Sequence, residues 1–299
     1  MSGCASSPCA HTSTSREAIY GQVCHAIALA QVQEGVYQRS FPIRQFAIKV
    51  YSKARLKAYH GKTQENPVKE LSAMQFIGEH DNVMGQVECC QDRDHVYSVM
   101  DFCDGGEVYD LVESNGAMGE GMARSYFRQV VNGLKHLHNM GIAHRDMSLE
   151  NLMHNTNGRV FIIDLGMCLR VPMVTDEATY EMRPCKIPPQ GICGKKNYIA
   201  PEVIENAHHF DATKVDIWAL GVILFIMLTG VPPIESATHL DQRYRMVCAG
   251  LLGSMLEQWH MAVSPLAVDL ISRILRPNPD DRLTLDQILT HPWMLENTL

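Results

Sequence analysis

Two short stretches decide the fold of this chain: AHRDMSLEN at residues 143–151 and FIIDLG at residues 161–166. Three of their side chains, Asp146, Asn151 and Asp164, supply a carboxylate, a carboxamide and a second carboxylate. Oxygen groups with this spacing are typical of a metal-assisted phosphoryl-transfer site. The first stretch also contains Ser148, two residues after Asp146, and a function assigned to this site has to account for this serine.

The residues between the two stretches predict a β-hairpin. Apolar runs at residues 152–153 and 160–163 flank Asn157-Gly158, a strong signal for a type I′ turn. Such a hairpin would bring Asn151 and Asp164 close together.

The pattern of apolar residues changes near residue 101. Before it, short apolar runs predict strands, with one helix between Asn66 and Ile77; after Met122, apolar residues every three or four positions predict helices. We therefore predict an α+β fold with a tail at residues 1–15, a small β-rich lobe at 16–100 and a larger α-helical lobe at 101–299.

Composition limits the classes of protein to consider. The chain has 299 residues, of which 46% are hydrophobic, so it can bury a substantial core. Its 26 basic and 33 acidic residues give a net charge of −7, which argues against a broad nucleic-acid interface. The longest apolar run, 217–228, is shorter than the roughly 18 residues of a spanning helix. We expect a buried core helix there and no stable membrane insertion.

The ten cysteines are scattered, without a CxxC pair. Together with the absence of a recognisable secretory leader, this favours reduced thiols in an intracellular compartment. We expect a cytoplasmic protein, with the nucleus as a second location.

From about Tyr20 to Trp293 the motifs resemble those of the eukaryotic protein kinase family, in the family's order. The resemblance implies transfer of the γ-phosphate of ATP to serine or threonine hydroxyls of a protein substrate. Asp146 would accept or orient the hydroxyl proton, and Asn151 and Asp164 would hold Mg²⁺.

The resemblance also implies how ATP is bound. Lys49, in Phe46-Ala47-Ile48-Lys49, would contact the ATP phosphates and pair with a helix glutamate, for which Glu70 is preferred and Glu65 is the alternative.

Other positions that match the family would surround the nucleotide. Met100 would be the gatekeeper, and Asp101 and Cys103 would offer backbone groups to adenine. Glu107 would meet the ribose or a basic substrate side chain, or else is only an exposed acid at a helix start. The cofactor-binding set is completed by Gly21, Val23, Ala47 and Met153.

The chain departs from the family in its phosphate-covering loop. Of three spaced glycines, the register Arg16–Val23 retains only Gly21. Because glycines there let backbone amides approach the phosphates, we expect a raised KM for ATP.

A second departure concerns two positions that touch across the catalytic aspartate in the family. Ser148 stands where Ser/Thr kinases place lysine, and Lys195 stands where they place threonine. We hypothesise an exchange, in which Lys195 reaches over Asp146 to the γ-phosphate and Ser148 supplies the hydroxyl. The alternative is two independent losses that slow catalysis.

Regulation and scaffolding follow from the same resemblance. Arg145 would receive a phosphate placed on Thr175, Thr179 or Tyr180 by an upstream kinase, unless residues 173–190 are simply a mobile loop. Glu202 would pair with Arg282, and the Asp216 carboxylate would accept backbone N–H groups of the catalytic loop.

We therefore predict a monomeric Ser/Thr protein kinase that uses MgATP. A pseudokinase acting as a nucleotide-binding scaffold is the alternative, and the set Lys49, Asp146, Asn151 and Asp164 argues against it. A small-molecule kinase fits less well, because residues 200–202 close a segment typical of peptide docking.

Overall fold

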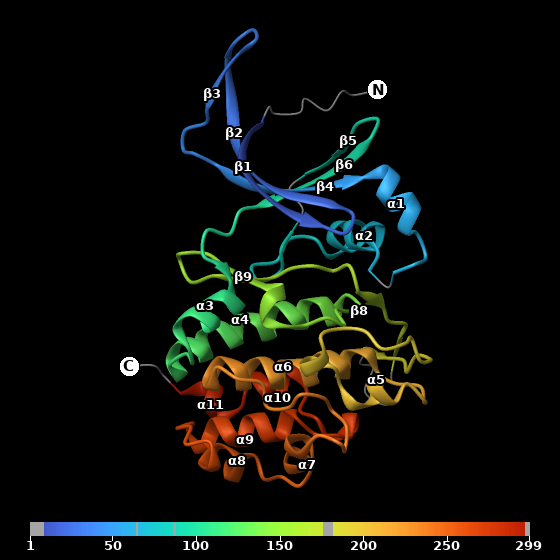
Figure 1. Cartoon of the computed structure of the whole chain (residues 1–299), viewed down its shortest axis with the longest axis vertical. Coiled ribbons are helices and arrows are strands. Elements are labelled where there is room, and N and C mark those ends of the chain that lie inside the picture. Colours follow the sequence, from blue (N-terminus) through green and yellow to red (C-terminus); the bar gives the residue numbers. More distant parts are fainter. Residues whose placement is uncertain (1–8, 64, 86–87, 176–181, 297–299) are drawn as a thin grey trace. The chain divides into compact units, whose positions relative to one another are not determined.

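The computed structural model describes residues 9–63, 65–85, 88–175 and 182–296 (Figure 1). The chain divides into two compact units, the first comprising Met1–Glu79 with Met84–Asp104 and the second His80–Val83 with Gly105–Leu299. The predicted two-lobed α+β architecture is therefore confirmed. The change of unit comes after residue 104, and residues 80–83 belong to the second unit.

An antiparallel sheet forms most of the first unit. Its strands run in the order β1, β2, β4, β6, β5, and β3 pairs with β2. Their bounds are β1 Cys9–Ala18, β2 Gly21–Gln33, β3 Val36–Arg39, β4 Gln45–Ser52, β5 Glu88–Gln91 and β6 His95–Asp101.

The first strand corrects one expectation. Residues 9–15 belong to β1, although we expected a tail over 1–15; residues 1–8 lie outside the described residues. The pairing with β2 runs from Cys9 opposite Ala28 to Ala18 opposite Gly21. Backbone N–H and C=O groups make this ladder, so it forms without the apolar pattern by which we sought a strand.

Two helices accompany the sheet, α1 Lys53–Tyr59 and α2 Pro67–Ile77. Helix α2 starts as its sequence predicts: the Asn66 side chain accepts hydrogen bonds from Val68 N at 3.0 Å and Lys69 N at 3.3 Å, and Pro67 occupies the first turn. The start of α2 decides which of its residues face the sheet, and Glu70 is buried there.

The second unit is mainly helical, with short strands that support its loops. Its helices are α3 Val108–Asn115, α4 Glu120–Asn139, α5 Pro201–Glu205, α6 Ala212–Thr229, α7 Gln242–Cys248, α8 Leu252–Gln258, α9 Pro265–Ile274, α10 Leu285–Leu289 and α11 Pro292–Leu295. Its strands are β7 Gly106–Glu107, β8 Ile142–Ala143, β9 Leu152–His154, β10 Val160–Ile162, β11 Leu169–Arg170, β12 Met173–Thr175 and β13 Met182–Pro184.

Helix α6 is the centre of the second unit and packs against α4 and α9 (Figure 1). Its length and composition would allow it to cross a membrane, yet 89% of its 18 residues are buried inside the structure. Asp211 caps its start by accepting from Thr213 N at 2.9 Å, and Gly230 ends it with a left-handed φ of 76°. The predicted core helix at residues 217–228 is confirmed.

The hairpin between the two decisive stretches also forms, but its turn differs from the prediction. Strands β9 and β10 pair Leu152 with Ile162 and His154 with Val160. In the connection, Gly158 has a φ of 77°, whereas Asn157 does not have the positive φ that a type I′ turn requires. The Asn155 side chain accepts from Asn157 N and Arg159 N instead, which favours a longer turn.

Candidate active site

A buried carboxylate on α6 holds the loop that carries Asp146. Asp216 Oδ1 accepts a hydrogen bond from Arg145 N at 2.7 Å, and its Oδ2 accepts one from His144 N at 2.8 Å. The backbone at Arg145 has a φ of 67°, a conformation that costs energy for a residue with a side chain. The two hydrogen bonds stabilise it, so the predicted scaffolding contact of Asp216 is present.

Two histidines that we did not predict extend this support. The His138 imidazole, at the end of α4, lies 2.9 Å from Asp216 Oδ2. The fully buried His144 accepts from Asp146 N at 3.3 Å on Nδ1, which leaves Nε2 to donate to the Ile163 carbonyl at 2.9 Å. His144 thus joins the loop of Asp146 to the residue before Asp164.

Asp146 and Asn151 are in direct contact. The Asn151 amide nitrogen donates to the Asp146 carbonyl at 2.6 Å and to Asp146 Oδ2 at 2.9 Å. Burial raises the pKa of Asp146 above that of an ordinary aspartate, and the nearby Lys195 charge opposes this shift. The carboxylate is fixed in place and is more basic than one in water.

The donor set near Asn151 fits a divalent metal ion. Because the Asn151 nitrogen faces Asp146, its carboxamide oxygen is left to act as a ligand. Ile163 N donates to the Asn151 carbonyl at 3.0 Å, which keeps the start of β9 beside the residue before Asp164. Gly166 N donates to Asp164 Oδ1 at 3.1 Å, and no described residue is hydrogen-bonded to Asp164 Oδ2. Asn151 and Asp164 can therefore each offer a hard oxygen, as Mg²⁺ prefers.

The structure brings Ser148 and Lys195 together. Lys195 Nζ donates to Ser148 Oγ at 2.7 Å, and it lies 3.6 Å from Glu150 Oε1. Gly194, with a φ of 92°, makes this approach feasible: a Cβ there would lie 3.2 Å from the Arg145 carbonyl oxygen and 3.5 Å from Asp146 Oδ1. The contact that the exchange hypothesis requires is present.

In the first unit, most of the expected nucleotide-binding residues share one face of the sheet. The register pairs Val23 with Lys49 on β2 and β4, and Ala47 with Met100 on β4 and β6. Residues directly opposite in an antiparallel pair point to the same side, as do residues two apart on one strand. Val23, Ala47, Lys49 and Met100 therefore form a single surface.

Of the two candidate partners of Lys49, the structure selects Glu70. The Lys49 ammonium contacts Glu70 Oε1, and the Tyr51 hydroxyl donates to Glu70 Oε2 at 2.9 Å. Glu70 is only 2% exposed, so both of its oxygens are bound inside the unit. Glu65 contributes its backbone carbonyl to a different contact.

That contact involves the tip of the β1–β2 hairpin, where we expected a phosphate-covering loop. The buried Tyr20 donates from its hydroxyl to the Glu65 carbonyl at 2.9 Å and also contacts Thr63 Oγ1. Gly21 has a packing role, since a Cβ there would lie 1.7 Å from the Val50 carbonyl oxygen. Gly21, the one glycine that this loop retains, is therefore needed for the close packing of the loop against β4, independently of any contact with phosphate.

The remaining nucleotide-binding candidates lie in both units. Asp101 is the last residue of β6. Burial raises the pKa of the Cys103 thiol to about 12, so this thiol stays neutral. Both belong to the first unit. In the second unit, Glu107 pairs with Met153 between β7 and β9.

In the segment from Asp164 to Glu202, which we call the activation segment, one predicted ion pair is present. Arg282 makes two hydrogen bonds of 2.7 Å to the Glu202 carboxylate, and its guanidinium also lies 5.2 Å from the Trp218 ring centroid. The Arg282 side chain is fully buried. This pair closes the segment as we expected.

Arg145 has a partner that we did not predict. Its Nη2 donates to Cys193 Sγ at 3.0 Å, and burial raises the pKa of this thiol although Arg145 opposes the shift. Of the candidate phosphate acceptors, Thr175 lies in β12, which pairs with β13, whereas Thr179 and Tyr180 lie outside the described residues. At least residues 173–175 and 182–184 are therefore a ladder, not a simple loop.

With this geometry established, comparison with known proteins defines the class. The family called protein kinase domain matches residues 30–294. The chain belongs to the protein kinase family.

Individual relatives are similar at about one third identity. The chain is 32% identical to CBL-interacting protein kinase 9 of Oryza sativa subsp. japonica over 78% of its own length and 47% of the relative. It is 32% identical to CBL-interacting serine/threonine-protein kinase 26 of Arabidopsis thaliana over 84% of its own length and 53% of that relative. The chain thus spans about half the length of these curated relatives.

Proposed function

We propose that this chain is a Ser/Thr protein kinase that transfers the γ-phosphate of MgATP to hydroxyl groups of protein substrates. One observation carries the proposal: Asn151 donates to Asp146 and keeps its carboxamide oxygen available, while its backbone carbonyl binds the amide of Ile163, the residue before Asp164. A pseudokinase would not need this arrangement. The names of the Ser/Thr kinase relatives support the choice of substrate hydroxyl.

The residues of the second unit would act mainly by position. Asp146 would orient the substrate hydroxyl and accept its proton as the new O–P bond forms and the bond from the γ-phosphorus to ADP breaks. Because burial raises the pKa of Asp146, the carboxylate is a better proton acceptor than an exposed aspartate. Mg²⁺, held by Asn151 and Asp164, would neutralise charge on the phosphate oxygens.

Lys195 would replace the missing lysine. Its ammonium is held by Ser148 at 2.7 Å and opposes the rise that burial causes in the pKa of Asp146, so its charge would act on a phosphate held beside that carboxylate. In the first unit, Lys49 is paired with Glu70 and would contact ATP phosphates.

Protein partners belong to the proposal as well. The relatives are named for interaction with CBL, and we propose by analogy that a protein partner also binds this chain. An upstream kinase acting on Thr175, Thr179 or Tyr180 fits with Arg145, because a thiol is a weak acceptor that a phosphate would displace. We propose a monomer located inside the cell.

The test is incorporation of radiolabelled phosphate from ATP into a generic basic protein and a degenerate peptide array. We expect incorporation by the parent chain and none by Asp146→Asn. Incorporation that survives Asp146→Asn, or none by the parent with or without prior treatment by an activating kinase, would overturn the proposal.

A further inference from the structure

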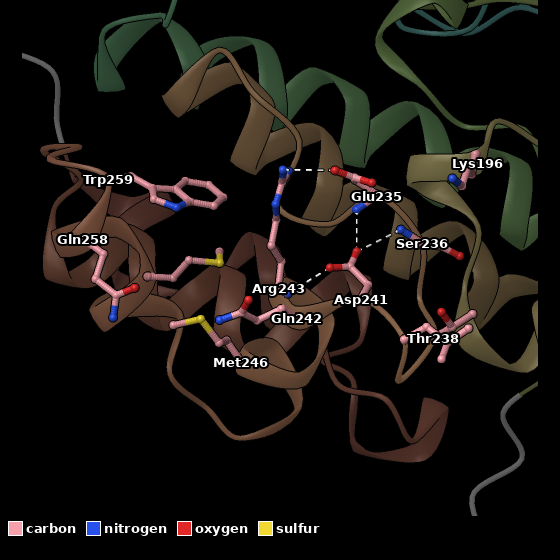
Figure 2. A pocket seen from close by; sticks show the side chains of 12 residues that line it. Lys196, Glu235, Ser236, Thr238, Asp241, Gln242, Arg243, Met246, Gln258 and Trp259 are labelled. Carbon is pink, nitrogen blue, oxygen red and sulfur yellow. Dashed lines mark hydrogen bonds and ion pairs between the residues drawn. The ribbon is translucent and has the colours of Figure 1, made fainter.

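The second unit has a groove that the proposed chemistry does not use (Figure 2). It has a volume of about 740 Å³, within the range of ligand-binding clefts. We call it the docking groove. It is lined by α7, α8, the loop before α7 and one residue of the activation segment, Lys196. Figure 2 shows Lys196 at one end and Trp259 with Gln258 at the other.

One rim of the docking groove is rigid. Asp241 accepts hydrogen bonds from Glu235 N at 2.7 Å, Ser236 N at 3.1 Å and Arg243 N at 2.8 Å. Burial acts to raise the pKa of Asp241, but the backbone N–H donors outweigh it and lower the pKa overall. The Asp241 charge is therefore already satisfied within the rim.

The walls combine apolar surface with a fixed guanidinium. Arg243 bonds to Glu235 Oε1 at 3.2 Å and lies 5.5 Å from the Trp259 ring centroid. Met246 and Met255 line the same space, and methionine side chains adapt to irregular apolar partners. Leu240, on the loop before α7, is 94% exposed. These walls suit an apolar side chain of a partner.

The charges that line the docking groove indicate which charge its partner should carry. Both acids of the groove are matched, Asp241 by amides and Glu235 by Arg243. Lys196 is exposed, and no ion pair involves it within the described parts of the chain. The unmatched charge of the docking groove is therefore positive and lies at the Lys196 end.

The position of Lys196 also suggests the occupant. It directly follows Lys195, whose ammonium bonds to Ser148 beside Asp146. A polypeptide whose hydroxyl reaches Asp146 would pass Lys196 and could continue into the groove toward Trp259. The Lys196 end of the groove is thus adjacent in sequence to the residue that contacts the loop of Asp146.

We propose that the docking groove binds a segment of the protein substrate itself, with an acidic residue near the acceptor for Lys196 and an apolar residue farther away for Met246, Met255 and Trp259. This inference rests on the proposed kinase function and adds substrate selection to it. The proposed occupant of the docking groove is therefore a peptide segment that contains both an acidic and an apolar residue.

The test is a serine-acceptor peptide library in which Glu, Lys or Leu is fixed at each flanking position in turn. The parent chain should prefer Glu near the acceptor and Leu farther away on the same side. Lys196→Glu should lower kcat/KM for the Glu peptides about fivefold and favour the Lys peptides instead. Met246→Gln should lower kcat/KM about tenfold for the Leu peptides only.

Matched controls are Lys62→Glu and Met122→Gln, exposed residues outside the groove, which should keep the parental preferences. If Lys196→Glu folds and phosphorylates but leaves the acidic preference unchanged, the docking proposal is wrong and the kinase function stands. If no peptide is phosphorylated in a manner that depends on Asp146, the proposed function fails first, and the docking proposal falls with it.

Discussion

Lys195 Nζ donates a hydrogen bond of 2.7 Å to Ser148 Oγ, linking the activation segment to the loop that carries Asp146. By the family resemblance, Lys195 puts an ammonium at a position that usually has a hydroxyl, and Ser148 puts a hydroxyl at a position that usually has an ammonium. Ser148 is fully buried, so its hydroxyl is a defined partner for this one cation. A charge held in this way can act on a substrate phosphate without first being ordered.

If the two residues act as a pair, their variants should not be additive. We expect Lys195→Ala and Ser148→Ala each to lower kcat, and the double variant to be little worse than Lys195→Ala alone. The coupling energy should be about 1.5–3 kcal/mol, the range for hydrogen bonds to charged groups. Steady-state kinetics of the four proteins measures it, with Lys62→Ala as a control. Strictly additive losses would mean two independent defects.

Asp146 should destabilise the folded chain near neutral pH. Its folded-state pKa is raised, so its contribution favours folding at low pH and is lost as pH rises through the folded pKa. Asp146→Asn removes the charge and keeps the shape. We expect the variant to be more stable than the parent at neutral pH, with the difference disappearing below about pH 4, where an ordinary aspartate is also protonated. Thermal unfolding across pH tests this, with the exposed Asp281→Asn as control, and a less stable variant at pH 7 would contradict it.

The contacts that sequence predicted correctly are those carried by motifs. Lys49 with Glu70, Glu202 with Arg282, and Asp216 with the catalytic loop each join residues whose spacing matches a family pattern. The hairpin that lies between the candidate metal ligands Asn151 and Asp164 was also predicted, from the apolar runs on either side of its turn. Local sequence is sufficient to predict these contacts, because the residues that define each motif are the same residues that make the contact.

Other features depend on neighbours distant in sequence. Nothing near Tyr20 indicates that its hydroxyl bonds to the carbonyl of residue 65, and nothing near Gly21 indicates that the Val50 carbonyl lies against it. The sequence of α4 does not distinguish His138 from the other polar residues of this amphipathic helix. Its hydrogen bond with Asp216 forms because α4 packs against α6. The polar strand at residues 9–15 is held by backbone pairing, for which side chains give no signal.

The pair of Glu202 and Arg282 should be essential for stability. Arg282 also donates to the carbonyls of residues 276, 214 and 277. Arg282→Met leaves Glu202 and these carbonyls unpaired, so we expect a loss of about 3–5 kcal/mol in unfolding free energy. Glu202→Gln should cost less, because it keeps a hydrogen-bond acceptor. Urea denaturation compares them with Lys186→Met, which removes only an exposed pair with Asp280; equal losses for Arg282→Met and Lys186→Met would refute the expectation.

Gly21 should matter for folding before it matters for ATP. An alanine there places its Cβ 1.7 Å from the Val50 oxygen, and both atoms belong to backbone that cannot simply rotate away. We expect Gly21→Ala to cost about 3 kcal/mol, at the upper end for overpacked sites. Gly85→Ala, in open space without a positive φ, should cost little. Denaturation curves separate the two variants, and a Gly21→Ala protein of parental stability with only a raised KM for ATP would argue for a phosphate role alone.

Tyr20 should hold the tip of the β1–β2 hairpin in position for nucleotide binding. Its hydroxyl reaches the carbonyl of Glu65, one residue before the cap of α2, the helix that carries Glu70. Tyr20→Phe keeps the ring and loses the hydrogen bonds, so the hairpin tip must be ordered when ATP binds. We expect KM for ATP to rise about three- to tenfold, in line with the loss of the hydrogen bonds of this hydroxyl, while kcat changes little. Tyr37→Phe, on exposed β3, is the matched control and should leave both constants unchanged. A fall in kcat with KM unaltered would show that Tyr20 acts on the chemical step instead.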